Sequence, residues 1–211
     1  MTKTAKFWDN VAKKYAKSPI KNMESYTYTL ERTKSYLKPE DKILEIGAGT
    51  GSTAIELAPS VEQVIVTDIS PEMMNIAKEK ATEQNITNIE CLTSDALASD
   101  LTGPYDVILA HNLLHLVEDL PETIARANAL LKPGGLFISK TFCKPTSFGP
   151  PLYYIMRLAL PPMQLIGKAP FVAFLSIKEL EEQITAQGFE IIETANYPVK
   201  ETRRYIVARK I

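Results

Sequence analysis

The chain has 211 residues, of which 45% are apolar and 23% are charged, and its formal net charge is −1. This is an ordinary globular balance, and it gives no reason to expect binding to nucleic acid through bulk charge. Only two cysteines, Cys91 and Cys143, are present, too few for a disulfide framework or a zinc cluster. They fit a reducing compartment.

The N-terminus lacks the apolar core of a secretory signal, so we expect a cytoplasmic protein. The longest apolar region, 149–175, contains Arg157 and Lys168, and five prolines lie between 150 and 170. These interruptions argue against a transmembrane span but leave peripheral contact with a membrane open. Both a monomer and a homodimer fit this composition.

Two helices are predicted first, over 4–17 and 22–37, and Pro39 ends the second. Short apolar runs then alternate with helical segments, and each run suits a strand buried on both faces. The predicted strands are 42–46, 63–68, 89–93, 105–110 and 136–142. The predicted helices are 52–58, Ser70–Pro71 to about 84, and Pro121 to the LKPGG stretch at 131–135. This alternation predicts right-handed βαβ units and an α/β protein with a doubly wound, mostly parallel sheet.

The alternation stops after residue 143 and resumes at Ser176, which forms a predicted capping box with Glu179. The helix that begins there ends at Gly188. Two strands, 189–194 and 203–211, complete the chain, and their short connection predicts antiparallel neighbours.

The run ILEIGAGTG, 43–51, places glycines at 47, 49 and 51 directly after the first predicted strand. In open parallel sheets, ligands bind beyond the carboxyl ends of the strands, where the strand order reverses. Glycine permits positive φ and has no Cβ to keep a ligand away. The alternative is a tight turn that serves only close packing between strand and helix.

The acidic residues near this turn fit a nucleoside ligand. Asp68 ends the second strand 21 residues after Gly47, the spacing at which a carboxylate accepts hydrogen bonds from ribose hydroxyls. Asp95 and Ala96 follow the third strand, where a carboxylate and a backbone N–H can meet an adenine edge. Asp106 begins the fourth strand, at the wrong end for a ligand, and we interpret it as structural.

The glycine spacing also separates ligand classes. Dinucleotide folds carry G-x-G-x-x-G with a pyrophosphate on the helix N-terminus, whereas this chain has E-x-G-x-G-x-G. Glu45, two residues before the first glycine, is unfavourable beside a pyrophosphate and suits an amine or a sulfonium. A phosphate-cradling P-loop sequence is absent.

These stretches resemble the class I S-adenosylmethionine-dependent methyltransferases of the small-molecule kind, which includes ubiquinone and menaquinone methyltransferases. The resemblance rests on LEIGAGTG (44–51), VTDIS (66–70), SDAL (94–97), YDVILAHNLLHLV (105–117) and LKPGGLFISKT (131–141). FWDNVAKKY (7–15) resembles the N-terminal lid of the family. The resemblance covers about two thirds of the chain and fades across 144–175, where such enzymes differ by substrate. It implies a seven-stranded sheet whose last strand is antiparallel.

The resemblance also implies S-adenosylmethionine as the cofactor and S-adenosylhomocysteine as its product. The cofactor-binding residues that it implies are Tyr15, Glu45, Gly47, Ala48, Gly49, Asp68, Ile69, Met73, Asp95, Ala96 and His111. The glycine turn would hold the amino-acid part, Asp68 the ribose and Asp95 the adenine amino group. His111 would lie beside the methionine part, and Tyr15 would close over it.

No catalytic residue is assigned. A sulfonium methyl is already activated, so alignment supplies roughly 7–11 kcal/mol, and a base is needed only if the acceptor carries a proton. His111 and His115 could each serve as base. Against this, His111 could simply line the cofactor and His115 could be a hydrogen-bonded packing residue, and no third ligand supports a metal site. Cys143 is interpreted as a small buried residue.

Segment 147–176 is rich in apolar residues and in proline. It is interpreted as an acceptor lid divided into short pieces by its prolines, as a hairpin that only packs on the sheet, or as a surface for a membrane or a second subunit. We expect one methyltransferase domain over 1–211. Its parts are the N-terminal lid (1–38), the cofactor-binding core (39–143), the insertion (144–176) and the closing helix and hairpin (177–211).

The predicted function is methyl transfer from S-adenosylmethionine to a small, hydrophobic acceptor, without nucleic acid as a partner. Two alternatives remain: a membrane-associated lipid or quinone as acceptor, and a cofactor-binding regulatory protein without activity. A nicotinamide-dependent oxidoreductase is disfavoured by the glycine spacing.

Overall fold

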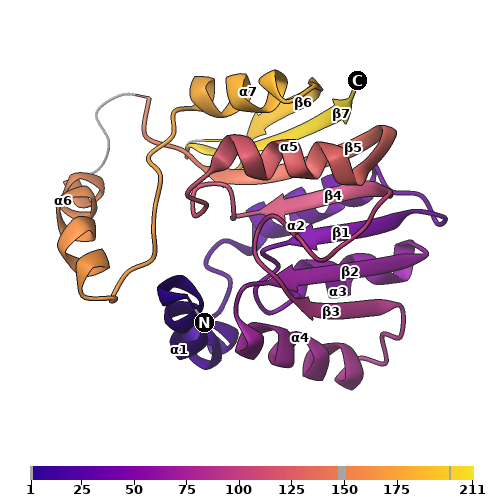
Figure 1. Ribbon diagram of the computed structural model, residues 1–211, viewed down its shortest axis with the longest axis horizontal. Helices are drawn as coiled ribbons and strands as arrows, with labels where there is room; N and C mark the ends of the chain where they lie inside the picture. Colours follow the sequence, from indigo (N-terminus) through magenta and orange to yellow (C-terminus); the bar gives the residue numbers. More distant parts are fainter. Residues whose placement is uncertain (1, 147–150, 200) are drawn as a thin grey trace.

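The structure is a computed structural model that describes residues 2–146, 151–199 and 201–211. A seven-stranded sheet lies at its centre, with helices on both faces (Figure 1). The strands are β1 (Lys42–Ile46), β2 (Gln63–Asp68), β3 (Ile89–Thr93), β4 (Tyr105–His111), β5 (Leu131–Phe142), β6 (Phe189–Asn196) and β7 (Arg203–Lys210). The helices are α1 (Lys3–Lys17), α2 (Met23–Lys34), α3 (Ser52–Leu57), η1 (Ala58–Ser60), α4 (Pro71–Glu83), α5 (Leu120–Leu130), α6 (Pro151–Leu165) and α7 (Ile177–Ala186).

The sheet order is β3-β2-β1-β4-β5-β7-β6, and β1 to β5 run parallel. β7 is antiparallel to both β5 and β6, so the prediction of an antiparallel last strand is confirmed. The chain moves outward from β1 through β2 to β3 and then returns to the other side of β1 at β4. The strand order therefore reverses at β1, which is where open α/β sheets bind their ligands.

The two faces of the sheet bury different apolar clusters. One cluster joins Ile43, Val66 and Leu109 of the strands to α3 and α4. The other joins Leu44 and Ile108 to α5 and α7. Residues that pair across neighbouring strands point to the same face of the sheet. The pairing register therefore shows which side chains lie together on each face.

The predicted bounds of β1, β2 and β3 agree with the structure, and the Ser176–Glu179 capping box of α7 is present. β5 begins at Leu131 rather than at residue 136, because Leu131 pairs with Tyr105 and the register shifts before the next pair. The second predicted helix is shorter than expected and ends at Lys34. Residues 94–104, all of them described, form no helix between β3 and β4.

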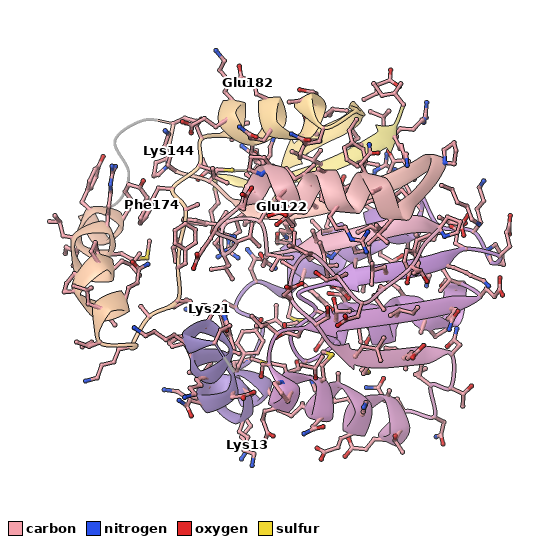
Figure 2. All side chains as sticks on the ribbon, viewed as in Figure 1. Lys13, Lys21, Glu122, Lys144, Phe174 and Glu182 are labelled. Carbon is pink, nitrogen blue, oxygen red and sulfur yellow. The ribbon has the colours of Figure 1, made fainter. Side chains whose placement is uncertain are left out.

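α6 lies apart from the sheet, beyond the carboxyl ends of the strands (Figure 1). It contains Pro161 and Pro162, so the prediction that these prolines divide the segment is wrong. Both stand in the last turns of an exposed helix, where water can replace the missing backbone hydrogen bonds. Pro150, the first of the five, lies outside the described residues. The buried ring of Tyr153 packs edge-on against Phe174, which Figure 2 shows on the segment that leads back to the body.

Candidate active site

The turn after β1 is built from three glycines in the left-handed region, with φ of +63° at Gly47, +56° at Gly49 and +69° at Gly51. The Ala48 N–H donates to the Thr67 carbonyl at 2.9 Å, which fixes the turn to β2. The Gly51 N–H donates to the Ala48 carbonyl at 3.0 Å, and α3 begins at the next residue. The backbone therefore needs positive φ at each of the three positions.

The three glycines differ in what surrounds them. A Cβ on Gly47 would lie 2.5 Å from Leu113 Cδ1, and one on Gly51 would lie 2.9 Å from Ala77 Cβ. Close packing explains the absence of a side chain at those two positions. A Cβ on Gly49 would meet only Tyr15 Cε1, at 3.8 Å. Gly49 is thus the member of the turn that presents bare backbone to open space.

Asp68 joins the end of β2 to this turn. Its Oδ2 accepts the Gly49 N–H at 2.9 Å, and its Oδ1 accepts the Ser70 N–H at 2.9 Å. Burial raises the pKa of the Asp68 carboxyl, the backbone N–H groups of Ser70, Gly49 and Ile69 oppose this shift, and the Asp9 charge adds to it. Each carboxylate oxygen has a second lone pair, so Asp68 can still accept from a hydroxyl of a ligand.

Helix α1 lies over the glycine turn. Asp9 Oδ1 accepts the Ser70 hydroxyl at 2.5 Å and the Glu72 N–H at 3.1 Å, which fastens α1 to the start of α4. Tyr15 follows on the same helix, with 53% of its surface exposed. Burial raises the pKa of Tyr15, and the charges of Asp68 and Glu45 raise it further. Tyr15 therefore lies over the turn as a partly open cover, and Asp9 is a residue that the sequence did not single out.

Glu45 is the most deeply buried acid of the site, with 2% exposure. Its Oε1 lies 3.9 Å from His111 Nδ1, and its Oε2 has no hydrogen-bond partner among the described residues. Burial raises the pKa of Glu45 to about 8, against the opposing Ala54 N–H. Burial lowers the pKa of His111 to about 4, and Lys140 contributes. At neutral pH both groups are uncharged, so this contact is not an ion pair.

An unpartnered oxygen on a buried carboxyl is costly in a folded protein, and once the carboxyl is ionised, Glu45 Oε2 calls for a donor that the described residues do not supply. The ammonium of an amino-acid ligand is such a donor. Glu45 Oε2 therefore fits the amino-acid part of S-adenosylmethionine, and the open backbone at Gly49 and the free lone pairs of Asp68 fit its nucleoside part.

The remaining predicted binding residues lie along the same edge of the sheet. The Ser94 N–H donates to the Asp68 carbonyl at 3.0 Å, which places the exposed Asp95 beside the end of β2. Asp95 Oδ1 accepts the Leu97 N–H at 3.0 Å. Ile69 and Ala96 are half-buried there, whereas the Met73 side chain is buried in the core. Tyr15, Glu45, Gly49, Asp68 and His111 converge most closely, and the binding roles of the whole set stay predictions.

The structure also shows what surrounds Asp106, Cys143 and His115, to which the sequence had assigned no binding role. Asp106, at the opposite end of the sheet, accepts the Lys42 N–H at 2.9 Å and Lys132 Nζ at 2.6 Å. Cys143 is fully buried, and burial raises the pKa of its thiol to about 11, so the interpretation as a small buried residue is confirmed. His115 is not the hydrogen-bonded residue that we expected, because its buried Nδ1 has no partner in the described part of the chain.

A small cavity of about 50 Å³ lies next to the His111 ring. Its lining comes from β4 and β5 on one side and from α2 and α3 on the other. The lining residues are Tyr26, Thr29, Leu30, Thr53, His111, Asn112 and Lys140. Lys140 was not predicted from the sequence, where its only signal was that it is the one charged residue in the strand run LFISKTF.

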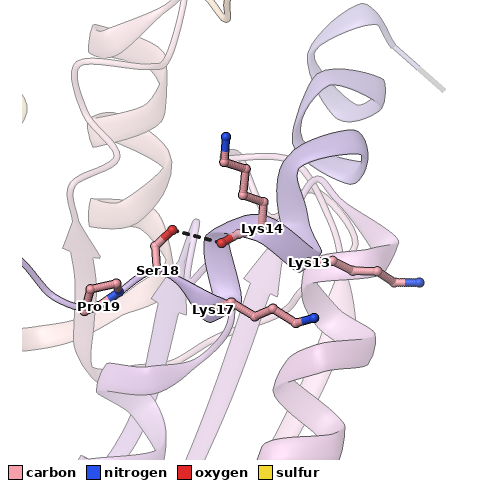
Figure 3. A pocket seen from close by; sticks show the side chains of 5 residues that line it. All are labelled: Lys13, Lys14, Lys17, Ser18 and Pro19. Carbon is pink, nitrogen blue, oxygen red and sulfur yellow. Dashed lines mark hydrogen bonds between the residues drawn. The ribbon is translucent and has the colours of Figure 1, made fainter.

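A second hollow, of about 520 Å³, is open to solvent at the end of α1. It is lined by Lys13, Lys14, Lys17, Ser18 and Pro19, and Figure 3 shows Lys14 pointing away from Lys13 and Lys17, which extend side by side toward solvent. The Ser18 hydroxyl donates to the Lys14 carbonyl at 2.9 Å. These side chains do not converge on one point, so we assign no site there. Within the described ranges, no group of three or more His, Cys, Asp or Glu could hold a metal ion.

Comparison with known proteins identifies the family. A family model described as a methyltransferase domain matches residues 20–194. The chain belongs to this family. It is a class I S-adenosylmethionine-dependent methyltransferase, as the sequence resemblance implied.

Among the curated relatives of this methyltransferase, the tRNA 5-carboxymethoxyuridine methyltransferase of Escherichia coli K12 is 35% identical over 112 residues. That match covers 51% of this chain and 42% of the relative. The highly reducing polyketide synthase easB of Emericella nidulans is 33% identical over 128 residues, which cover 55% of this chain and 5% of the synthase. The chain thus matches less than half the length of each of these relatives.

Two solved structures illustrate the fold. The YcgJ protein of Bacillus subtilis has a TM-score of 0.69 at 17% identity, covering 90% of this chain and 99% of that one. The [4+2]-cyclase SpnF has a TM-score of 0.72 at 17% identity, covering 88% and 80%. At this identity the likeness concerns the fold alone, and a cyclase among the neighbours illustrates that a fold does not decide a reaction.

Proposed function

We propose that this methyltransferase binds S-adenosylmethionine across the glycine turn and transfers its methyl group to a small, hydrophobic acceptor. The observation that supports this best is the buried Glu45 carboxyl, whose Oε2 has no partner among the described residues. It lies beneath a turn that exposes bare backbone at Gly49 and carries the Asp68 carboxylate beside it.

When bound, the cofactor supplies a methyl group that is already activated on a sulfonium. The protein residues then have binding tasks: Glu45 receives the ammonium, and Asp68 receives the ribose hydroxyls. Tyr15 narrows the opening above the turn and limits the access of water. Alignment of the acceptor with the methyl group does the remaining work, and it is worth roughly 7–11 kcal/mol.

Calorimetry tests the cofactor, and release of S-adenosylhomocysteine from a panel of acceptors tests the activity. We expect binding of S-adenosylmethionine and S-adenosylhomocysteine, no binding of NAD, and turnover with apolar acceptors. Transfer RNA belongs in the panel because the E. coli relative is named for it, and we expect no turnover of it. Cofactor binding without turnover of any acceptor would favour a regulatory protein.

A second acceptor class, a lipid or quinone held in a membrane, is favoured by the surface of α6. Leu158 is 79% exposed and Leu165 is 84% exposed, and Ile155 and Ile166 are exposed as well. No acidic residue occurs in the sequence between Glu122 and Glu179, so an anionic surface would meet no repulsion from this segment. No helix in the described ranges has both the length and the apolarity to span a membrane.

A further inference from the structure

Lys140 is a buried lysine that has no counter-ion among the described residues. The Lys140 residue is only 8% exposed. Its Nζ donates to the Ser25 hydroxyl at 3.3 Å and to the Thr29 hydroxyl at 3.2 Å. The Thr29 hydroxyl in turn donates to the Ser25 carbonyl at 2.9 Å. Lys140 forms no salt bridge with any residue that the structure describes. In the ammonium form, two of its three N–H groups therefore have acceptors, and the third has none within the described ranges.

The surroundings of Lys140 disfavour a positive charge. Burial and, to a smaller extent, the charge of Arg203 lower the pKa of the Lys140 ammonium to about 8, and the charge of Glu201 opposes this shift. A buried charge without a partner is normally removed from a protein interior, because a well-packed apolar residue is more stable there. A ligand with a negative charge would reverse this balance.

The position of Lys140 places this positive charge next to the cofactor site. Lys140 pairs with His111 across β4 and β5, and Glu45 pairs with Leu109, two residues before His111. The three ionisable side chains thus lie on one face of three neighbouring strands. His111 Nε2 is buried and has no hydrogen-bond partner in the described ranges.

The cavity that His111 and Lys140 line suits a small polar group. Its volume of about 50 Å³ is enough for about three water-sized groups. It is too small for a whole acceptor, and Tyr26, Thr29 and Thr53 add hydroxyls to its wall. A carboxylate or a single phenol-type oxygen matches this volume, and the remainder of such an acceptor would extend outside the cavity.

We propose that Lys140 and His111 bind an acidic oxygen of the methyl acceptor, so that the acceptor is an apolar molecule that carries a phenol, an enol or a carboxylic acid. This rests on the proposed function, because it assigns a substrate class to the same site. The free N–H of the Lys140 ammonium donates to the oxyanion, and a neutral His111 that carries its proton on Nε2 donates a second hydrogen bond.

The test uses 4-nitrophenol as a coloured probe with the protein saturated in S-adenosylhomocysteine. Because the site prefers the anion, the pKa of the bound probe should fall by at least about one unit, which corresponds to a tenfold preference. The phenolate absorbance reports this shift directly, and 4-nitroanisole is the neutral competitor. Benzoate as a competing ligand distinguishes a carboxylate site from a phenol site. If neither anion binds more tightly than the neutral competitor, the inference is overturned.

Lys140→Met keeps the apolar stem and removes the charge. We expect it to weaken probe binding by at least about tenfold and to leave S-adenosylhomocysteine affinity within about twofold. Lys42→Met is the matched control, because Lys42 begins β1 at the end of the strands away from the site. It should change neither affinity, since its ion pair with Glu62 is exposed. Unchanged probe binding in Lys140→Met would contradict the inference. A loss of S-adenosylhomocysteine binding would also contradict it, because Lys140 would then bind the cofactor and not the acceptor.

The readouts separate the two proposals. If the unmodified protein does not bind S-adenosylhomocysteine, the proposed function fails. If it binds S-adenosylhomocysteine but shows no preference for the anionic probe, only the assignment of Lys140 fails. The probe pKa in the unmodified protein decides the matter even if a variant does not fold, and a melting curve for each variant identifies that case.

Discussion

Asp68 accepts the backbone N–H of Gly49 at 2.9 Å, and this hydrogen bond ties the end of β2 to the turn that follows β1. The same carboxylate is the expected acceptor for the ribose hydroxyls of the cofactor. Asp68 therefore has two tasks, since it shapes the glycine turn before any ligand arrives and it offers its remaining lone pairs to that ligand. A substitution at Asp68 tests both tasks at once.

Asp68→Ala should lower cofactor affinity by at least about tenfold and also destabilise the protein. Two backbone N–H groups, of Gly49 and Ser70, lose their acceptor, and each costs about 1–3 kcal/mol if it stays unsatisfied. Calorimetry with S-adenosylhomocysteine measures the affinity, and denaturant unfolding measures the stability. Asp100→Ala, an exposed acid, is the control. Full affinity in a folded Asp68→Ala protein would remove Asp68 from the site.

The three glycines should respond differently to substitution. Gly47→Ala should lower stability, because its Cβ would lie 2.5 Å from Leu113 Cδ1. A Cβ on Gly49 has room in the ligand-free protein, apart from the strain of positive φ, and Gly49→Val should chiefly remove cofactor binding. Melting temperatures and calorimetry on both variants check this. A Gly49→Val protein with normal cofactor affinity would mean that the turn is only structural.

Cofactor binding should release a proton near neutral pH. The pKa of Glu45 is raised from 4.5 to about 8, so its carboxyl is protonated in the free protein at pH 7 and must ionise to pair with an ammonium. Affinity should therefore rise with pH up to about 8. The sign for stability is the opposite, because a raised folded-state pKa stabilises the free protein below pH 4.5, and this contribution is lost as pH rises toward 8.

Calorimetry in buffers of different ionisation enthalpy measures the proton release. Glu45→Gln should abolish it. The other ionisable groups near this carboxyl are Tyr15, Tyr26, Asp68, His111 and Lys140. Lys140→Met is the control, since the pKa of Lys140 is also about 8 and it should not contribute to binding of the cofactor. Equal proton release from Glu45→Gln and the unmodified protein would contradict the role of Glu45.

The sequence was sufficient for most of the fold. Short, mostly apolar runs such as KILEI and QVIVTD are typical of strands buried on both faces, and their predicted bounds agree with β1 and β2. The first residues of β5 could not be predicted, because Leu131 becomes a strand residue only by pairing with Tyr105. α6 passes through Pro161 and Pro162, which propensity alone assigns to a break.

The site was predicted as far as it follows from local spacing. Glu45, the glycines and Asp68 lie close to one another because consecutive parallel strands end at the same edge. Asp9 and Lys140 could not be found in this way. Asp9 acts through a contact with Ser70 that depends on how α1 packs, and Lys140 becomes notable only because no described carboxylate accompanies it.

The apolar surface of α6 should matter for the acceptor and not for the cofactor. Leu158→Gln combined with Ile155→Gln should reduce turnover of a vesicle-embedded acceptor by at least about tenfold, because exposed apolar area is lost. The affinity for S-adenosylhomocysteine should stay unchanged. Ile211→Gln is the matched control, since that residue is exposed directly after β7, at the end of the sheet away from α6. Equal flotation of all variants with anionic vesicles would exclude α6 as a membrane surface.

The central claim is that Glu45 holds the amino-acid part of S-adenosylmethionine beneath the glycine turn. Titration calorimetry of S-adenosylhomocysteine into the unmodified protein and into Glu45→Gln, with NAD as the competing ligand class, tests it most directly. We predict one site for S-adenosylhomocysteine in the unmodified protein, at least about tenfold weaker binding in Glu45→Gln, and no heat from NAD. Equal affinity in the two proteins, or binding of NAD in place of S-adenosylhomocysteine, would contradict the claim.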